Sequence, residues 1–240
     1  SVITLVLCFL SYRRDKDFSE PSYIEVRDLL SPPALFLLLL PLLSILGAFL
    51  LRFYQTNALL LSMIGIIAIV VALVAFNRFI DKKFYPLAIF MIAIALLSYR
   101  QLSFSYLMGT DIQLEYYVYN FTALNSQWAQ TPIISTYGSM LSITILPTVY
   151  SCLLAMDGMW VFKLIFPFLV SLVPLGLYEV YQKYTSEKTA FLSSFFFMSF
   201  VFFLGALTYL ARMQVAELFF ILLIMLILSR ELDLTKRVAL

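Results

Sequence analysis

Histidine is absent from this chain of 240 residues, and charged residues make up only 12% of it. The lack of histidine excludes a Ser-His catalytic triad, an imidazole zinc site and a histidine proton relay. The two cysteines, Cys8 and Cys152, lie in apolar stretches without the spacing of a metal site or a disulfide framework. Any acid–base or metal chemistry in this protein therefore falls to carboxylates.

The scarcity of charge also excludes an ordinary soluble domain. Such a domain is about 25% charged and about 45–50% apolar, whereas this chain is 62% apolar and has a mean hydropathy of +0.96. Its formal net charge is +2, from 16 basic and 14 acidic residues, so no excess of positive charge indicates a nucleic-acid partner. We expect a membrane protein whose first partner is the lipid bilayer.

Long apolar runs with almost no internal charge predict membrane-spanning helices. About 20 apolar residues span a bilayer as a helix, and lipid offers the backbone no partner outside that helix. We therefore expect an all-α, polytopic transmembrane helical bundle. The runs cover residues 2–10, 34–53, 57–76, 84–99, 137–156, 160–181, 190–210 and 215–229.

The first of these runs is too short to span, and the chain begins at Ser1 without an initiator methionine. We expect a fragment of a longer protein, with the first helix truncated. Residues 1–83 would hold N-terminal transmembrane helices, and residues 84–240 would form the membrane core with an external loop at 100–159.

The positions of the basic residues predict the orientation. Loops 11–31, 77–83, 182–189 and 230–240 contain all but four of the 16 lysines and arginines, so the positive-inside rule places these loops in the cytoplasm. Loop 100–159 is then extracytoplasmic. The four exceptions are Arg52, Arg100, Lys163 and Arg212.

With this orientation the run 137–156 lies between two external points, so it cannot cross the membrane once. It contains several serines and threonines, which suit a juxtamembrane helix at the outer surface. A re-entrant segment satisfies the same constraint.

Two carboxylates stand out in the external loop. Asp111 and Glu115 are the only charged residues between Gln101 and Met156. Four positions apart, they share one face of a helix, about 5–6 Å from each other. Such a pair repels itself unless a cation or a transferable proton lies between the two groups. The alternative is a helix cap at Asp111 and a solvated surface acid at Glu115.

A further acid follows the last external turn. Glu217 lies in the first turns of an apolar helix that begins near Arg212. An acid inside the membrane is a functional candidate, although an N-terminal acid paired with Arg212 is the alternative. Among the basic exceptions, Arg52 suits a snorkelling anchor, whereas Arg212 and Lys163 are candidates for binding a phosphate at the outer face.

This order of features resembles the GT-C glycosyltransferases, multi-pass enzymes that use polyprenyl-phosphate sugar carriers at the extracytoplasmic face. Their acidic motif in the first external loop is similar to Asp111 with Glu115, and a later Arg-to-acid segment is similar to Arg212 through Glu217. The resemblance implies a GT-C-like fold and sugar transfer to an acceptor that the sequence does not identify. Asp111, Glu115 and Glu217 would be catalytic, and Arg212 and Lys163 would bind the lipid phosphate.

With oxygen ligands only, Mg²⁺ or Mn²⁺ would suit this site better than zinc. Asp111 and Glu217 would then be the metal ligands. The alternative is a group transfer without a metal, in which Asp111 is the general base.

The chain also resembles a family of archaeal predicted membrane proteins of unknown function. It departs from that family at Leu204-Gly205-Ala206, where an acid is expected, and at Gln113, where a histidine is common. The matching segments are 11–18, 30–33, 109–111, 115–117, 161–163, 172–178, 211–212 and 216–218.

Two other functions compete with the enzyme. A transporter or flippase should carry polar residues at the membrane midplane, yet stretches 66–73, 89–97 and 218–228 carry no charged residue. A non-catalytic membrane scaffold would use the acids only as caps. Clustering of Asp111, Glu115 and Glu217 favours the enzyme, and separation beyond about 15 Å favours the scaffold.

Overall fold

The computed structural model of the chain describes residues 28, 30–77, 80–125, 127–128 and 135–228. Every regular element in these ranges is helical, and they contain no strand. The predicted all-α class is therefore confirmed for this part of the chain. The predicted helix at 2–10, the loop 230–240 and most of the loop 11–31 lie outside the described residues.

Three of the predicted apolar runs form long helices near the beginning of the described chain: α2 (Pro32–Tyr54), α3 (Ala58–Ala75) and α4 (Tyr85–Leu102). The two prolines that open α2 occupy the positions where a missing N–H costs no helical hydrogen bond. Four stretches are long and apolar enough to cross a membrane, with mean hydropathy of 1.4 to 3.0. They are Pro32–Tyr54, Ala58–Ala75, Lys82–Leu102 and Gly158–Gln182.

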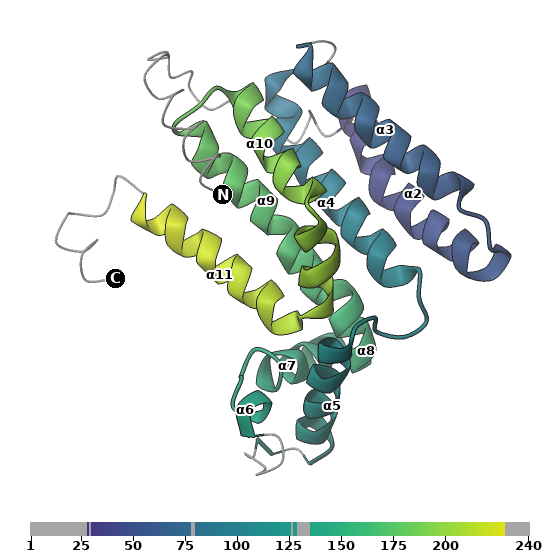
Figure 1. Cartoon of the computed structure of the whole chain (residues 1–240), viewed down its shortest axis with the longest axis vertical. Helices are drawn as coiled ribbons and strands as arrows, with labels where there is room; N and C mark the ends of the chain where they lie inside the picture. The colour runs from purple at the N-terminus through teal and green to yellow at the C-terminus, as the bar shows by residue number, and fades with distance from the viewer. Residues whose placement is uncertain (1–27, 29, 78–79, 126, 129–134, 229–240) are drawn as a thin grey trace.

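Figure 1 shows these helices packed side by side with α9 (Phe166–Gln182) and α10 (Glu187–Ser199), and α11 (Ala211–Ile227) lying alongside α9. We call these six helices the bundle. Because α4 packs against both α2 and α9, helices on either side of the predicted boundary at residues 83/84 are in contact. The division into two domains stays a prediction.

Close contacts between small and polar residues hold the bundle together. The Ser44 hydroxyl donates a 2.6 Å hydrogen bond to the carbonyl of Ala95, which joins α2 to α4. A Cβ on Gly47 would lie 2.6 Å from the Leu60 side chain, so only glycine permits this approach of α2 to α3. Small residues at helix crossings allow such backbone proximity in membranes.

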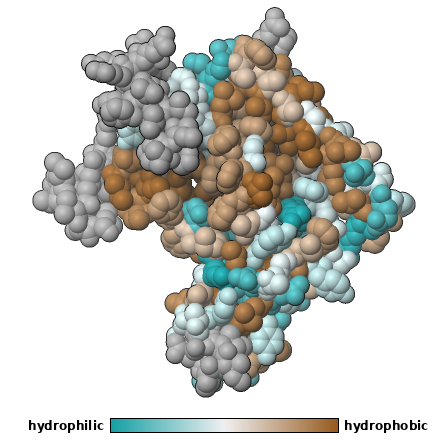
Figure 2. Space-filling view, viewed as in Figure 1, coloured by the Kyte–Doolittle hydropathy of each residue, from teal (hydrophilic) through white to brown (hydrophobic). Residues whose placement is uncertain are grey.

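The outward faces of the bundle are apolar. Leu46, Phe53, Leu61 and Ile69 on α2 and α3 are each more than half exposed, and apolar side chains cover much of the bundle in Figure 2. A soluble protein seldom exposes so large a continuous apolar surface. These faces and the candidate spans indicate contact with a lipid bilayer, consistent with the predicted multi-pass membrane protein.

A second layer lies across one end of the bundle (Figure 1). It consists of α5 (Thr110–Asn125), α6 (Ser135–Gly138), α7 (Ile145–Leu154) and α8 (Gly158–Trp160), and we call it the end layer. The 10 residues of α7 extend about 15 Å, which is half the thickness of a bilayer core. The run 137–156 therefore does not span, as predicted.

The run 160–181 is not one regular helix. A π-helical turn, η4 (Val161–Ile165), separates α8 from α9. It lies just before Pro167, whose nitrogen has no hydrogen to donate to the preceding turn. The N–H of Phe166 bonds instead to the carbonyl of Val161, five residues back, so the helix widens around Lys163.

The run 190–210 is also interrupted, where one continuous helix was predicted. After α10 the chain becomes extended at Phe200 and continues through η5 (Phe202–Ala206) and η6 (Leu207–Tyr209), at 58° to α10. At the far end of this segment, just before α11, two backbone carbonyls accept hydrogen bonds from side chains of other helices or of the next turn. Gln101 donates to the carbonyl of Thr208 at 3.1 Å, and Gln214 donates to that of Leu207 at 2.9 Å.

Ion pairs gather the loops at the opposite end of the bundle. Lys83 lies 2.8 Å from Asp28, and Lys82 lies 3.5 Å from Glu187. These contacts bring together residues from three loops that were predicted to share one side of the membrane. Which end of the bundle faces the cytoplasm stays a prediction.

The contact between Gly158 and Tyr119 provides a test of the packing between α5 and α8. A Cβ on Gly158 would lie 2.1 Å from the Tyr119 ring, whereas one on Gly65 in α3 would meet open space. We expect Gly158→Ala to lower the free energy of unfolding by about 1–3 kcal/mol through overpacking. Gly65→Ala should leave it unchanged or raise it slightly. Thermal unfolding in detergent measures both, and equal stabilities of the two variants would contradict the packing.

Candidate functional site

The candidate site begins at the N-terminus of α5. Gly109 has a φ of +117°, a conformation that favours glycine, and its backbone packs against the Tyr209 ring. The turn lets α5 begin at Thr110, with Asp111 in its first turn. Asp111 and Glu115 consequently lie on one face of the helix, as their spacing predicts.

Glu115 is fully buried, with 0% of its side chain exposed. One carboxylate oxygen, Oε2, accepts a 2.6 Å hydrogen bond from the backbone N–H of Ala211, the first residue of α11. The other, Oε1, accepts a 2.6 Å hydrogen bond from Nη1 of Arg212. The N-terminus of α11 thus meets a carboxylate, which its unpaired N–H groups and dipole favour.

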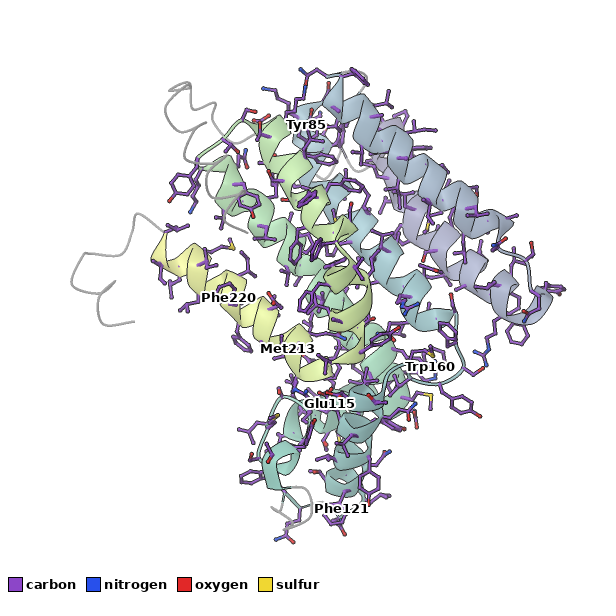
Figure 3. All side chains as sticks on the ribbon, in the orientation of Figure 1. Tyr85, Glu115, Phe121, Trp160, Met213 and Phe220 are labelled. Carbon is purple, nitrogen blue, oxygen red and sulfur yellow. The ribbon has the colours of Figure 1, made fainter. Side chains whose placement is uncertain are left out.

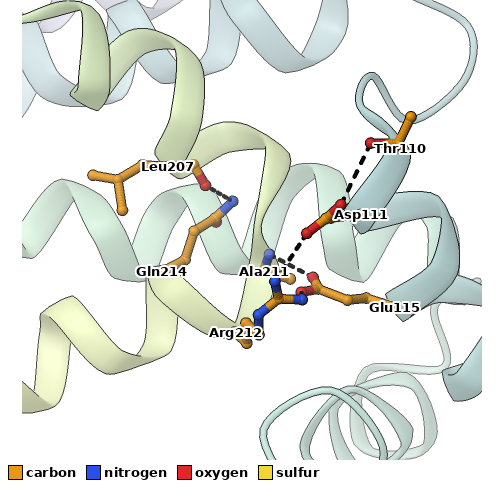
Figure 4. Close-up of polar contacts among 7 residues, drawn as sticks. All are labelled: Thr110, Asp111, Glu115, Leu207, Ala211, Arg212 and Gln214. Carbon is orange, nitrogen blue, oxygen red and sulfur yellow. Dashed lines mark hydrogen bonds and ion pairs between the residues drawn. The ribbon is translucent and has the colours of Figure 1, made fainter. Parts of the chain in front are cut away.

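Arg212 joins the two acids. Its Nη2 lies 2.9 Å from Oδ2 of Asp111 while Nη1 contacts Glu115 (Figure 4). Its guanidinium carbon lies 4.9 Å from the centroid of the Tyr137 ring, in cation–π contact. The cation predicted between the carboxylates is therefore an arginine of this chain, and we call Asp111, Glu115 and Arg212 the carboxylate–arginine triad.

The three members differ in access to solvent. The Asp111 side chain is 42% exposed and that of Arg212 is 24% exposed, in contrast to the buried Glu115. Figure 3 shows Glu115 at the junction of the end layer and the bundle, far from Tyr85 at the other end. A molecule arriving from outside would therefore meet Asp111 first.

Burial controls the protonation of Glu115. Loss of solvation raises the pKa of this carboxyl to about 7, against the lowering effect of the Ala211 N–H and of Arg212. With both acids ionised the triad carries one net negative charge. Protonation of Glu115 makes the triad neutral, so its charge changes near neutral pH.

Aromatic rings fix the orientation of α5. Tyr116 and Tyr119 stack on one another with centroids 5.7 Å apart, and Tyr119 lies 5.8 Å from Phe162. Phe162 in turn contacts Phe166 at 5.0 Å, edge to face. These contacts attach α5 to the first turns of α9 and turn the acidic face of α5 toward α11.

Two of the predicted site residues lie outside the triad. Glu217 is partly buried on α11, and within the described residues it forms no ion pair with Arg212, the alternative considered from sequence. Lys163 is 3% exposed and donates to the carbonyls of Phe104 and Ser105, at 2.7 and 2.8 Å. Lys163 therefore stabilises the loop that precedes α5 through these two hydrogen bonds.

Sequence reasoning missed Tyr137 and the N–H of Ala211 as members of the site. Tyr137 lies far from Arg212 along the chain and carries no charge that would signal a partner. Gln113, where the resemblance suggests histidine, donates a 3.2 Å hydrogen bond to the carbonyl of Leu107 and closes the turn into α5. No sequence pattern distinguishes this amide from an ordinary surface glutamine.

The triad does not fit a divalent cation between Asp111 and Glu115, because Arg212 occupies that position. In the described part of the chain, no group of three or more His, Cys, Asp or Glu residues is placed to hold a metal ion. Arg212 supplies the positive charge that a metal would bring. The predicted Mg²⁺ or Mn²⁺ at Asp111 and Glu217 stays a prediction.

No protein-family model, curated protein or solved structure matches the chain. The likeness to GT-C glycosyltransferases and to the archaeal family therefore rests on the short motifs quoted above. The function has to be argued from the geometry of the triad.

The raised pKa of Glu115 predicts a pH-dependent stability. Between pH 4.5 and about 7 the folded protein holds a proton on Glu115 that the unfolded chain has lost, so the free energy of unfolding falls as pH rises through this window. We expect Glu115→Gln to flatten this slope, whatever its effect on absolute stability. Thermal unfolding across the window measures it.

Asp81→Asn, which removes an exposed carboxylate before the short η2 turn (Lys82–Phe84), is the matched control and should keep the slope. A slope that persists unchanged in Glu115→Gln would show that Glu115 does not titrate in this range.

Proposed function

We propose that this protein is a membrane glycosyltransferase that moves a sugar from a polyprenyl-phosphate carrier to an acceptor, with Asp111 as the general base. The observation that carries the proposal is the triad. A half-exposed carboxylate is held by an arginine that is itself fixed by a fully buried carboxylate. A catalytic side chain keeps one orientation only if neighbouring residues hold it by such bonds.

The position of the triad supports a lipid-linked donor. The triad lies where the apolar bundle meets the end layer (Figure 3). On α11, which begins at the triad, Phe219, Phe220 and Leu223 are exposed. A polyprenyl chain can lie along such a surface while its sugar reaches Asp111. In this proposal the end layer faces the extracytoplasmic side.

The chemistry is a displacement at the anomeric carbon. Asp111 takes the proton of the acceptor hydroxyl, whose oxygen bonds to the anomeric carbon as the bond from that carbon to the phosphate oxygen breaks. The polyprenyl phosphate leaves with the electron pair. A general base has to lie within about 3 Å of the proton it takes, and Oδ1 of Asp111, whose only partner among the described residues is Thr110 at 3.4 Å, is the available oxygen.

Arg212 and Glu115 act through Asp111. Arg212 holds Oδ2 and thereby turns Oδ1 outward, while Glu115 fixes Arg212. Tyr137 covers one face of the guanidinium, and Trp128, which donates to the carbonyl of Gly138 at 2.8 Å, steadies the helix that carries Tyr137. Glu115 is therefore a positioning residue in this proposal.

A non-catalytic scaffold is the second candidate. It is favoured by the mutual bonding of the triad, which clamps α5 to α11 whether or not a substrate binds. A scaffold needs the Glu115 bonds, whereas the ion pair of the partly exposed Asp111 would add little to it. Substitution of Asp111 therefore separates the two candidates.

We expect Asp111→Asn to lower the rate of sugar transfer by about 10²–10⁴-fold, the usual contribution of a general base. Its stability should change by less than about 1 kcal/mol, because the ion pair is partly exposed and an amide oxygen still accepts from Arg212. The assay follows transfer from a panel of polyprenyl-phosphate hexoses in proteoliposomes.

Asp81→Asn is again the control, since it removes an exposed carboxylate at the opposite end of the bundle. Unchanged transfer in Asp111→Asn would remove Asp111 from the mechanism. A wild-type protein that transfers no sugar from any donor would favour the scaffold.

A further inference from the structure

Arg100, in the last turn of α4, is held by an aromatic residue instead of an acid. Its Nη2 donates to the hydroxyl oxygen of Tyr209, and its guanidinium carbon lies 5.2 Å from the centroid of that ring. No carboxylate among the described residues lies within 4 Å of the Arg100 guanidinium, and its buried Nε has no acceptor there. The side chain is thus positioned but not neutralised.

This pair adjoins the triad. Tyr209 precedes Ala211 by two residues, and the backbone of Gly109, two residues before Asp111, packs against the Tyr209 ring. The neighbouring Gln101 is buried and bonds to the carbonyl of Thr208. One short turn, residues 208–211, therefore contacts both groups: Tyr209 binds Arg100, and the N–H of Ala211 binds Glu115 of the triad.

Two other cations at this end, Arg212 and Lys163, already have partners among the described residues. Arg212 is shared between Asp111 and Glu115, so the triad with both acids ionised is negative and repels an anion. Lys163 donates two of its three N–H groups to backbone carbonyls. A phosphate approaching Asp111 therefore requires a cation other than these two, and Arg100 is the one fixed next to the triad without an acid.

We propose that Arg100 and Tyr209 form an anion subsite that binds the phosphate group of a ligand beside Asp111. The guanidinium has further N–H donors besides the one used on Tyr209. The phenol accepts from Arg100, which leaves its own O–H free to donate and strengthens it as a donor. In the transfer reaction, which rests on the proposed function, this subsite would hold the phosphate of the leaving carrier.

The surroundings favour a lipid phosphate over a free phosphate ester. Arg100 ends an apolar helix that is long enough to span a membrane, and the loop that follows exposes Phe104, Tyr106 and Met108. A basic residue at the end of such a helix lies at the level of lipid headgroups. A polyprenyl phosphate places its charge at this level while its chain remains in the bilayer.

Direct binding tests the subsite without relying on catalysis. The full chain in nanodiscs is titrated with a polyprenyl monophosphate, with phosphatidylglycerol and with inorganic phosphate. We expect Arg100→Gln to weaken binding of the polyprenyl phosphate by about tenfold or more, since a charge-assisted hydrogen bond is lost. Tyr209→Phe should weaken it less, by about threefold to tenfold.

Arg52→Gln is the matched control, because Arg52 is exposed near the end of α2, where it contacts Phe53. It removes the same charge without touching the proposed subsite, and its affinity should equal that of the wild type. Arg100→Lys, which keeps the charge, should retain most of the affinity. If Arg100→Gln does not fold, judged by circular dichroism, Tyr209→Phe carries the test.

Two outcomes would overturn the subsite, and a third would change its ligand. Wild-type affinity in both Arg100→Gln and Tyr209→Phe would do so, as would an equal loss in Arg52→Gln, which would indicate only general attraction. Inorganic phosphate that binds as tightly as the lipid, with the same dependence on Arg100, would keep the subsite but make its ligand a free phosphate ester.

The failure of this subsite is distinguishable from that of the transferase. If the wild type binds polyprenyl phosphate but transfers no sugar, and Arg100→Gln loses this binding, the subsite is supported and the enzyme is contradicted. Transfer with an unchanged KM for the donor in Arg100→Gln would support the enzyme and contradict the subsite.

Discussion

The buried carboxylate of Glu115 is the constraint on which the rest of the site depends. An ionised group without solvent is costly unless it is paired and hydrogen-bonded, and here both oxygens have partners, the N–H of Ala211 and the guanidinium of Arg212. Because Glu115 belongs to the end layer and both partners begin α11, satisfying this one group fixes the end layer against the bundle.

The reactive geometry follows from that link. If Arg212 left Glu115, a buried carboxyl oxygen would lose its partner, so Arg212 keeps one orientation toward Asp111, whose carboxylate is partly open to solvent. The same turn, 208–211, carries Tyr209 and with it Arg100. Asp111, a proton acceptor, and Arg100, a cation without an acid partner among the described residues, are thereby both held next to this short turn at the border of the apolar bundle.

The sequence predicted the helices and the shared face of Asp111 and Glu115, because hydropathy and i,i+4 spacing are local properties. The sequence did not show that Arg212 pairs with Asp111 and Glu115 and not with Glu217. These pairs join residues that are 97 and 101 positions apart along the chain. The break at Phe200 and the carbonyl contacts of Lys163 were missed for a related reason. Lys163 bonds to carbonyls 59 and 58 positions away along the chain, and the interruption at Phe200 falls within a continuous apolar run that carries no local signal of it.

A double-mutant cycle measures the central link directly. Unfolding free energies of the wild type, Glu115→Gln, Arg212→Gln and the double variant give the coupling between the two side chains. If Glu115 and Arg212 hold the end layer to the bundle, the coupling should exceed about 1 kcal/mol, because loss of Arg212 leaves one oxygen of the buried Glu115 without its partner and Glu115→Gln removes the charge that Arg212 pairs with. Effects that add to within about 0.5 kcal/mol would contradict this account.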